Sequence, residues 1–151
     1  MYKFLWLAVI AISCAAASDD RPTLSGTWQL DMAHSRLEDA KLKAATWSIN
    51  QNDDSVQISE TLTDNGGKEK KVDIQCGTEG QACKVKENGQ PTQVSMYYNG
   101  AALVVLEQWH GTDFVTKKRI QTSEDGKTMT VNVMHISPPG RKDESWTFVK
   151  H

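Results

Sequence analysis

The sequence predicts an all-β protein: an antiparallel up-and-down β-barrel of eight to ten strands, with one short helix after the first strand. Segments in which polar and apolar residues alternate recur along the 151 residues. Strong turn signals separate these segments, among them Asn88-Gly89, Asn99-Gly100 and Asp125-Gly126. Asn-Gly and Asp-Gly tolerate the positive φ angles of tight hairpins, so consecutive strands should pair with each other.

Ten segments qualify as strands, and several show a clear period of two. They cover residues 24–31, 45–52, 55–63, 68–76, 83–87, 92–98, 102–109, 113–122, 128–137 and 144–150. In one of them Val56, Ile58 and Leu62 share a face with Glu60, and such alternation indicates one buried and one wet face. A meander of this length leaves two bare edges unless it closes, which favours a barrel over a β-sandwich with longer crossovers.

One segment has the pattern of a helix. Ser35-Arg36-Leu37-Glu38 fits a capping box, in which the Ser and Glu side chains satisfy backbone N–H groups at a helix start. Leu37, Ala40 and Ala44 follow at helical spacing. We therefore expect a short helix between the first two strands.

The first 17 residues have the three-part order of a secretory signal peptide. Lys3 precedes the apolar run 4–12, and Ala15-Ala16-Ala17 supplies small residues for cleavage. The run is too short to cross a bilayer core of about 30 Å. Residues 18–23 would then form an N-terminal leash and residues 24–151 one domain.

Two N-terminal fates stay open, because Ile12-Ser13-Cys14-Ala15 also resembles the lipidation signal of bacterial lipoproteins. Cleavage after Ala17 would give a free periplasmic or secreted protein. Lipidation of Cys14 would give a membrane-anchored one, and this is the only membrane contact we expect.

The remaining cysteines, Cys76 and Cys83, form an even pair in a compartment that permits disulfides. Their spacing does not fit a C-x-x-C redox or zinc motif. We predict a structural disulfide that contributes roughly 2 to 3 kcal/mol by the chain-entropy estimate.

The first strand carries a motif that points to a family. Gly26-Thr27-Trp28 lies in Leu24–Leu30, and Ser123 to Thr128 forms a matching hairpin. This pattern resembles the lipocalin-like β-barrels, or calycins, and in particular a bacterial exported lipocalin-like domain of unknown role. The resemblance implies that Trp28 closes one end of the barrel beneath a late cation, Lys150 or alternatively Arg119. It also implies an apolar ligand inside the barrel.

The function predicted from these observations is binding of a small hydrophobic molecule in the barrel lumen. The candidate ligand-binding residues are Trp47, Tyr98, Trp109, Phe114 and Arg119. The alternative is a filled barrel whose hairpin loops, led by the loop between the cysteines, make it a protein-interaction or inhibitor module.

Catalysis is the least favoured hypothesis. The four histidines show no metal spacing, nucleophile and phosphate-loop motifs are absent, and no cofactor is implied. Glu60 and Glu107 could act as an acid–base pair only if both faced a lumen within about 10 Å of each other. The net charge of −2, with only short basic runs, gives no indication of nucleic-acid binding.

Overall fold

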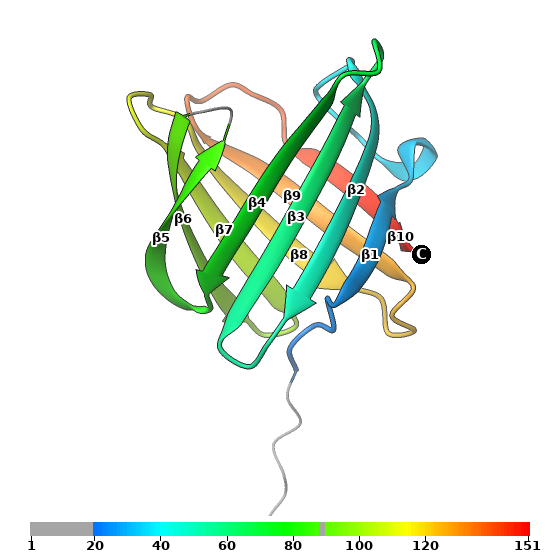
Figure 1. The fold of residues 1–151 in the computed structure, drawn as a ribbon, viewed down its shortest axis with the longest axis vertical. Coiled ribbons are helices and arrows are strands. Elements are labelled where there is room, and N and C mark those ends of the chain that lie inside the picture. Colours follow the sequence, from blue (N-terminus) through cyan, green and yellow to red (C-terminus); the bar gives the residue numbers. More distant parts are fainter. Residues whose placement is uncertain (1–19, 88–89) are drawn as a thin grey trace, which may run out of the picture.

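The protein is a single ten-stranded antiparallel sheet curled into a nearly closed barrel (Figure 1). The structure, a computed structural model, describes residues 20–87 and 90–151. Its strands are β1 (Gly26–Leu30), β2 (Leu42–Gln51), β3 (Ser55–Asp64), β4 (Glu69–Gly77), β5 (Glu79–Glu87), β6 (Gln90–Asn99), β7 (Ala102–Trp109), β8 (Val115–Thr122), β9 (Thr128–Ser137) and β10 (Glu144–Lys150). The predicted signal peptide, including Cys14, lies outside the described residues. Among those that are described, no helix has the length and apolar character needed to cross a membrane.

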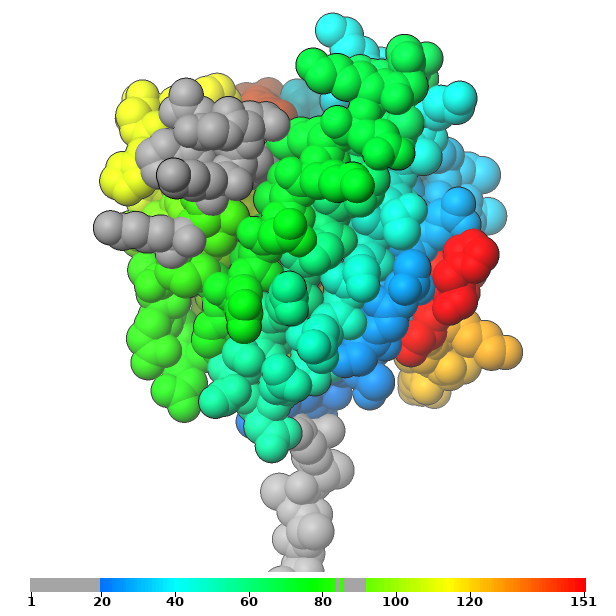
Figure 2. Space-filling model, viewed as in Figure 1, coloured from blue at the N-terminus to red at the C-terminus, as the bar shows by residue number. Residues whose placement is uncertain are grey.

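The strand order is β4-β3-β2-β1-β10-β9-β8-β7-β6-β5, so each strand pairs with its neighbour in sequence and β1 pairs with β10. Leu30 opposite Phe148 and Trp28 opposite Lys150 fix the β1–β10 register. In Figure 2 the C-terminal residues (red) lie against the first strand (blue) accordingly. The up-and-down barrel predicted from the turn spacing is confirmed, at the upper end of the predicted strand number.

The barrel has two ends, which we call the mouth and the base. The mouth carries the β3–β4, β7–β8 and β9–β10 links and the 35–41 segment, at the top of Figure 1. The base carries the β2–β3, β4–β5, β6–β7 and β8–β9 links, and residues 20–25 approach it from below.

The base is closed by the Gly26-Thr27-Trp28 motif. Trp28 is fully buried and donates its indole N–H to the Leu24 carbonyl at 2.8 Å. Lys150 Nζ lies 5.1 Å from the centre of the Trp28 ring. Gly26 has a φ of 138°, and a Cβ atom there would lie 2.7 Å from Lys150 Cε. Glycine is therefore required at this position mainly by the backbone conformation, because the flexible end of the lysine side chain can move aside.

The predicted helix is not present. After β1 the chain makes only a 3-10 turn, η1 (Met32–His34), capped by the Asp31 side chain. Ser35, the expected helix cap, instead accepts the Thr147 backbone N–H at 2.9 Å. Arg36 pairs with Ser145 as an isolated β-bridge. Pairing with β10 thus outcompetes the local helical propensity, which in so short a segment is weak.

The predicted Cys76–Cys83 disulfide is confirmed, with the Cα atoms 5.8 Å apart. The segment between the cysteines is not the free loop we expected, because β5 already begins at Glu79. β4 and β5 are the two edges of the sheet and share no hydrogen-bonded ladder. They lie side by side at the base and diverge towards the mouth (Figure 1). The disulfide therefore closes the barrel at its seam.

Candidate ligand-binding site

The base half of the barrel interior is filled with apolar side chains. The largest fully buried side chains come from strands all around the barrel and occupy most of the space there. They include Trp28, Phe148, Leu24, Met96, Leu103, Ile120 and Met129. Any bound molecule would therefore reach this apolar floor from the mouth.

Above this floor, charged side chains meet inside the barrel. Lys118 on β8 faces inward because its strand neighbour Ile120 does, and its Nζ lies 2.8 Å from Glu107 Oε1 on β7. The same nitrogen lies 3.6 Å from Glu60 Oε1 on β3. Thr116 donates a hydrogen bond to Glu107 Oε2 at 3.1 Å.

We call Lys118, Glu60 and Glu107 the lumen triad. β3 and β8 lie far apart in the strand order, so the triad spans the lumen from wall to wall. Its side chains are 17%, 8% and 6% exposed, respectively. Lys118 Nζ also lies 5.7 Å from the centre of the Trp47 ring. The middle of the barrel is thus a nearly dry, charged layer, in which electrostatic interactions are stronger than in water.

Several buried hydrogen-bonding atoms on the inward faces lack a partner among the residues that the structure describes. They are Trp47 Nε1 on β2, Thr92 Oγ1 on β6, Trp109 Nε1 on β7 and His135 Nδ1 on β9. Trp47 is 1% and Thr92 2% exposed. A buried donor without a partner costs about 1 to 3 kcal/mol, so these groups favour an occupant that can accept hydrogen bonds.

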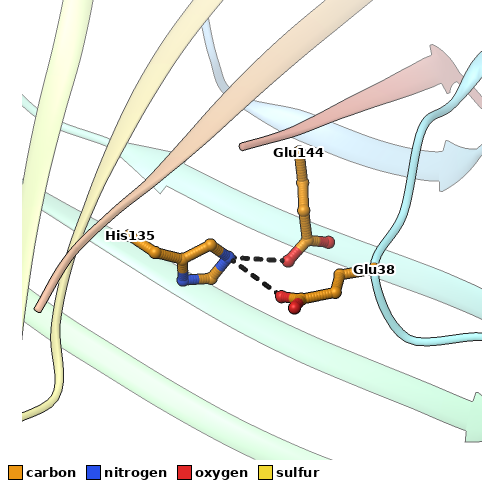
Figure 3. Close-up of side chains that lie close together, drawn as sticks. All are labelled: Glu38, His135 and Glu144. Carbon is orange, nitrogen blue, oxygen red and sulfur yellow. Dashed lines mark hydrogen bonds and ion pairs between the residues drawn. The ribbon is translucent and has the colours of Figure 1, made fainter. Parts of the chain in front are cut away.

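A second polar cluster lies at the mouth, where His135 Nε2 faces two carboxylates (Figure 3). The nitrogen is 3.1 Å from Glu144 Oε1 and 3.5 Å from Glu38 Oε2. Glu144 also accepts the Trp146 indole N–H at 2.8 Å. The cluster ties the 35–41 segment to β9 and β10.

The ligand atoms of Glu38, His135 and Glu144 lie within 4.8 Å of one another, which is near enough for a metal ion. Arg141, however, donates to Glu38 Oε2 through Nε at 3.1 Å and Nη2 at 2.7 Å. This contact lowers the pKa of Glu38, with smaller contributions from the nearby positive charges. Because Arg141 occupies the oxygen that would bind a metal, we interpret the cluster as an ion-pair latch.

A hollow of about 630 Å³ opens at the mouth between the 35–41 segment and the ends of β2, β3 and β4. Leu42, Leu62 and Lys70 line it from the inward faces of these strands. Its size is within the range of small-molecule pockets. This hollow is a route by which an apolar molecule could enter.

The candidate residues taken from the sequence lie in different places. Trp47 is at the centre of the interior, 4.8 Å from Phe148 between ring centres. Tyr98 is at the base, where its hydroxyl accepts a hydrogen bond from Gln51 Nε2 at 2.8 Å. Trp109 faces inward near the mouth.

Phe114 and Arg119 do not reach the lumen. Phe114 is 36% exposed in the β7–β8 link and packs on Trp109 with ring centres 5.9 Å apart. Arg119 lies between the inward residues Lys118 and Ile120, and so it points outward beside Val104 and Asn132. The inward cation on β8 is Lys118, which the sequence analysis did not single out. The alternation of Thr116, Lys118 and Ile120 was the signal that could have found it.

The fold has well-defined structural neighbours, although neither a family model nor a curated protein matches the sequence. A mutant of the REP1-NXSQ fatty acid transporter is 14% identical, with a TM-score of 0.63 over 84% of this chain and 97% of that chain. Fatty-acid-binding protein 1 of Echinococcus granulosus is 10% identical, with a TM-score of 0.61 over 83% and 96%.

An abundant heat soluble (SAHS) protein from Ramazzottius varieornatus is also 10% identical, with a TM-score of 0.64 over 86% of this chain and 96% of that chain. Identities this low establish the fold but not the ligand. The similarity extends over nearly the full length of each neighbour. This chain therefore has the antiparallel β-barrel fold of the calycins, as its first strand predicted.

Proposed function

We propose that this protein binds a small, mostly apolar molecule inside its barrel. The observation that carries the proposal is the pair Trp47 Nε1 and Thr92 Oγ1, buried hydrogen-bonding atoms that face the lumen without a partner among the described residues. The hydrocarbon part of the ligand would pack against Leu42 and Leu62 in the hollow at the mouth. Removing apolar surface from water contributes about 25 cal/mol per Å², which supplies the driving force.

Binding can be tested with Nile red, an uncharged dye whose fluorescence rises in an apolar environment. We expect saturable binding with one dye per barrel, and displacement by long-chain lipids. A matched pair of variants locates the site: Val105→Trp, which fills the lumen, should abolish binding, whereas Val149→Trp on the exposed face of β10 should not. Failure of every lipid to displace the dye would refute lumenal binding.

Acid–base catalysis is the second candidate, because Glu60 and Glu107 both face the lumen and share one contact, Lys118 Nζ. The two carboxylates therefore lie within the separation of about 10 Å that an acid–base pair requires. A catalytic carboxylate must, however, exchange a proton with its substrate. Lys118 lies against both carboxylates, so the arrangement is that of a buried ion cluster and we favour a binding role.

We further propose that the protein is exported, either free or lipidated at Cys14. The order of charge, apolar run and small residues in 1–17 supports export, as does the disulfide, which persists in oxidising compartments. Intact-mass measurement of the mature protein tests this directly. A mature N-terminus at Ser18, or a diacylated Cys14, is expected, and an uncleaved chain would contradict export.

A further inference from the structure

We infer that the lumen selects an uncharged amphiphile with a hydrogen-bond-accepting oxygen, such as a fatty alcohol or an acyl ester, over a fatty-acid anion. The inference rests on the proposed lumenal binding and names the ligand class of that same site. It follows from the charged side chains inside the lumen and from the buried donors that have no partner among the described residues.

The first step is the charge of the lumen triad. Lys118 is one formal positive charge held between two formal negative charges, Glu60 and Glu107. A ligand carboxylate entering this layer would add a third negative group around a cation that is already shared. Like charges in a nearly dry interior disfavour one another strongly, so a carboxylate would be rejected here.

Second, other charged groups also face inward or line the mouth. Glu144 contributes a further carboxylate at the mouth. Its neighbour His135 already contacts both Glu144 and Glu38. Arg141 is held by Glu38. Arg119, the basic residue next to Lys118, points outward. Lys68 and Lys70 line the hollow at the mouth, above the apolar floor, and Lys70, which lies on the inward face of β4, is the competing position for an anion.

The third step is what the interior offers instead. Trp47 and Trp109 each present an indole N–H, which donates a hydrogen bond and cannot accept one. The Thr92 hydroxyl can donate as well. A hydroxyl, ester or amide oxygen would accept from these groups without bringing a charge into the interior. The site therefore fits a neutral polar head attached to a hydrocarbon chain.

The experiment compares three ligands with the same eighteen-carbon chain: oleic acid, oleyl alcohol and methyl oleate. Each displaces Nile red from the purified protein at a pH where oleic acid is ionised, below its critical micelle concentration. We expect the two neutral ligands to bind at least about tenfold more tightly than oleate. Equal or tighter binding of oleate would overturn the inference while leaving lumenal binding intact. Displacement by none of the three would overturn both.

Variants identify the groups responsible. Glu60→Gln with Glu107→Gln removes two negative charges that contact Lys118 and should raise oleate affinity about tenfold, with little change for oleyl alcohol. Glu69→Gln, on the exposed face of β4, is the matched control and should change neither. Trp47→Phe should weaken the neutral ligands and spare oleate. If the double variant fails to fold, the Trp47→Phe result and the three-ligand comparison still decide the question.

Binding of an anion at Lys70 is the alternative that these experiments must exclude. If an anion were bound at the mouth instead, Lys70→Gln would lower oleate affinity and the wild-type protein would prefer oleate. That pair of results would contradict selection by the lumen triad. We expect Lys70→Gln to leave the affinity for oleyl alcohol unchanged.

Discussion

Removal of the Cys76–Cys83 disulfide should open the barrel at its seam. The bond encloses a loop with a sequence separation of 7, and its loss restores conformational freedom to the unfolded chain. For a loop of about eight residues the chain-entropy relation gives about 2.5 kcal/mol at 25 °C. In a domain of this size each kcal/mol shifts the melting temperature by about 2 to 4 °C, so a decrease of about 5 to 10 °C is expected.

The location of the effect tests the reasoning more sharply than its size. β4 and β5 have no hydrogen-bonded ladder between them, whereas β1 is paired on both sides. Cys76→Ala with Cys83→Ala should therefore lose hydrogen-exchange protection first in β4 and β5, with β1 and β10 still protected. Urea unfolding of the reduced wild-type protein is the control and should show the same loss of stability.

Two results would refute this account of the seam. One is a destabilisation below about 0.5 kcal/mol, which would mean that the bond constrains little. The other is a loss of protection spread evenly over all the strands, which would mean that the disulfide supports the whole barrel and not its edge.

Three further perturbations test individual contacts. Gly26→Ala should destabilise the barrel by about 1 to 3 kcal/mol in urea unfolding, and adding Lys150→Ala should recover only part of this, because the strained φ remains. Lys118→Met should cost about 3 to 5 kcal/mol by removing the cation that contacts both buried carboxylates, and a loss below about 1 kcal/mol would contradict the triad. Arg141 lowers the pKa of Glu38, so the latch contributes stability above the ordinary glutamate pKa of 4.5 and loses it as the pH falls through the lowered value. The hydrogen-exchange protection factors of residues 35–41 should fall over that acidic range, and Glu38→Gln should remove this pH dependence of the protection.

Most of the barrel could be predicted because its rules are local. Hairpin turns and alternating polarity fix which strands pair and which side chains face inward, and neither depends on distant parts of the chain. Val56, Ile58 and Leu62 were placed on one face with Glu60 from the sequence, and the structure has that face inward. The same alternation, applied to Thr116, Lys118 and Ile120, places Lys118 on the inward face, where the structure has it.

The helix failed for a reason that local rules do not contain. A capping box at Ser35 is a genuine local preference, but it competes with strand partners more than a hundred residues away in the sequence. Ser35 bonds to Thr147 and Arg36 pairs with Ser145, and these long-range bonds become available only once β10 is in place. Tertiary pairing therefore decided a segment that propensity alone assigned to a helix.

The site was less predictable because it is made by closure. Glu60 and Lys118 lie on strands that are distant in sequence and in strand order, and only the curling of the sheet brings them together. Arg119 was one of the ligand-binding residues predicted from the sequence. Arg119 directly follows Lys118, and adjacent residues of a strand point to opposite faces of the sheet, so Lys118 faces inward and Arg119 outward.

The position of the lumen triad itself argues for binding over a filled scaffold. Replacing a buried ion cluster by apolar side chains of similar volume is often neutral or stabilising by 1 to 4 kcal/mol. A barrel whose interior served only as a core would gain from Leu or Met at positions such as Glu60, Glu107 and Lys118, as it has apolar residues below them. Instead, the charged layer lies directly above the apolar floor, beside the buried indole donor of Trp47. Charges placed at that level add nothing that packing needs, which supports the proposal that they select the polar head of an occupant.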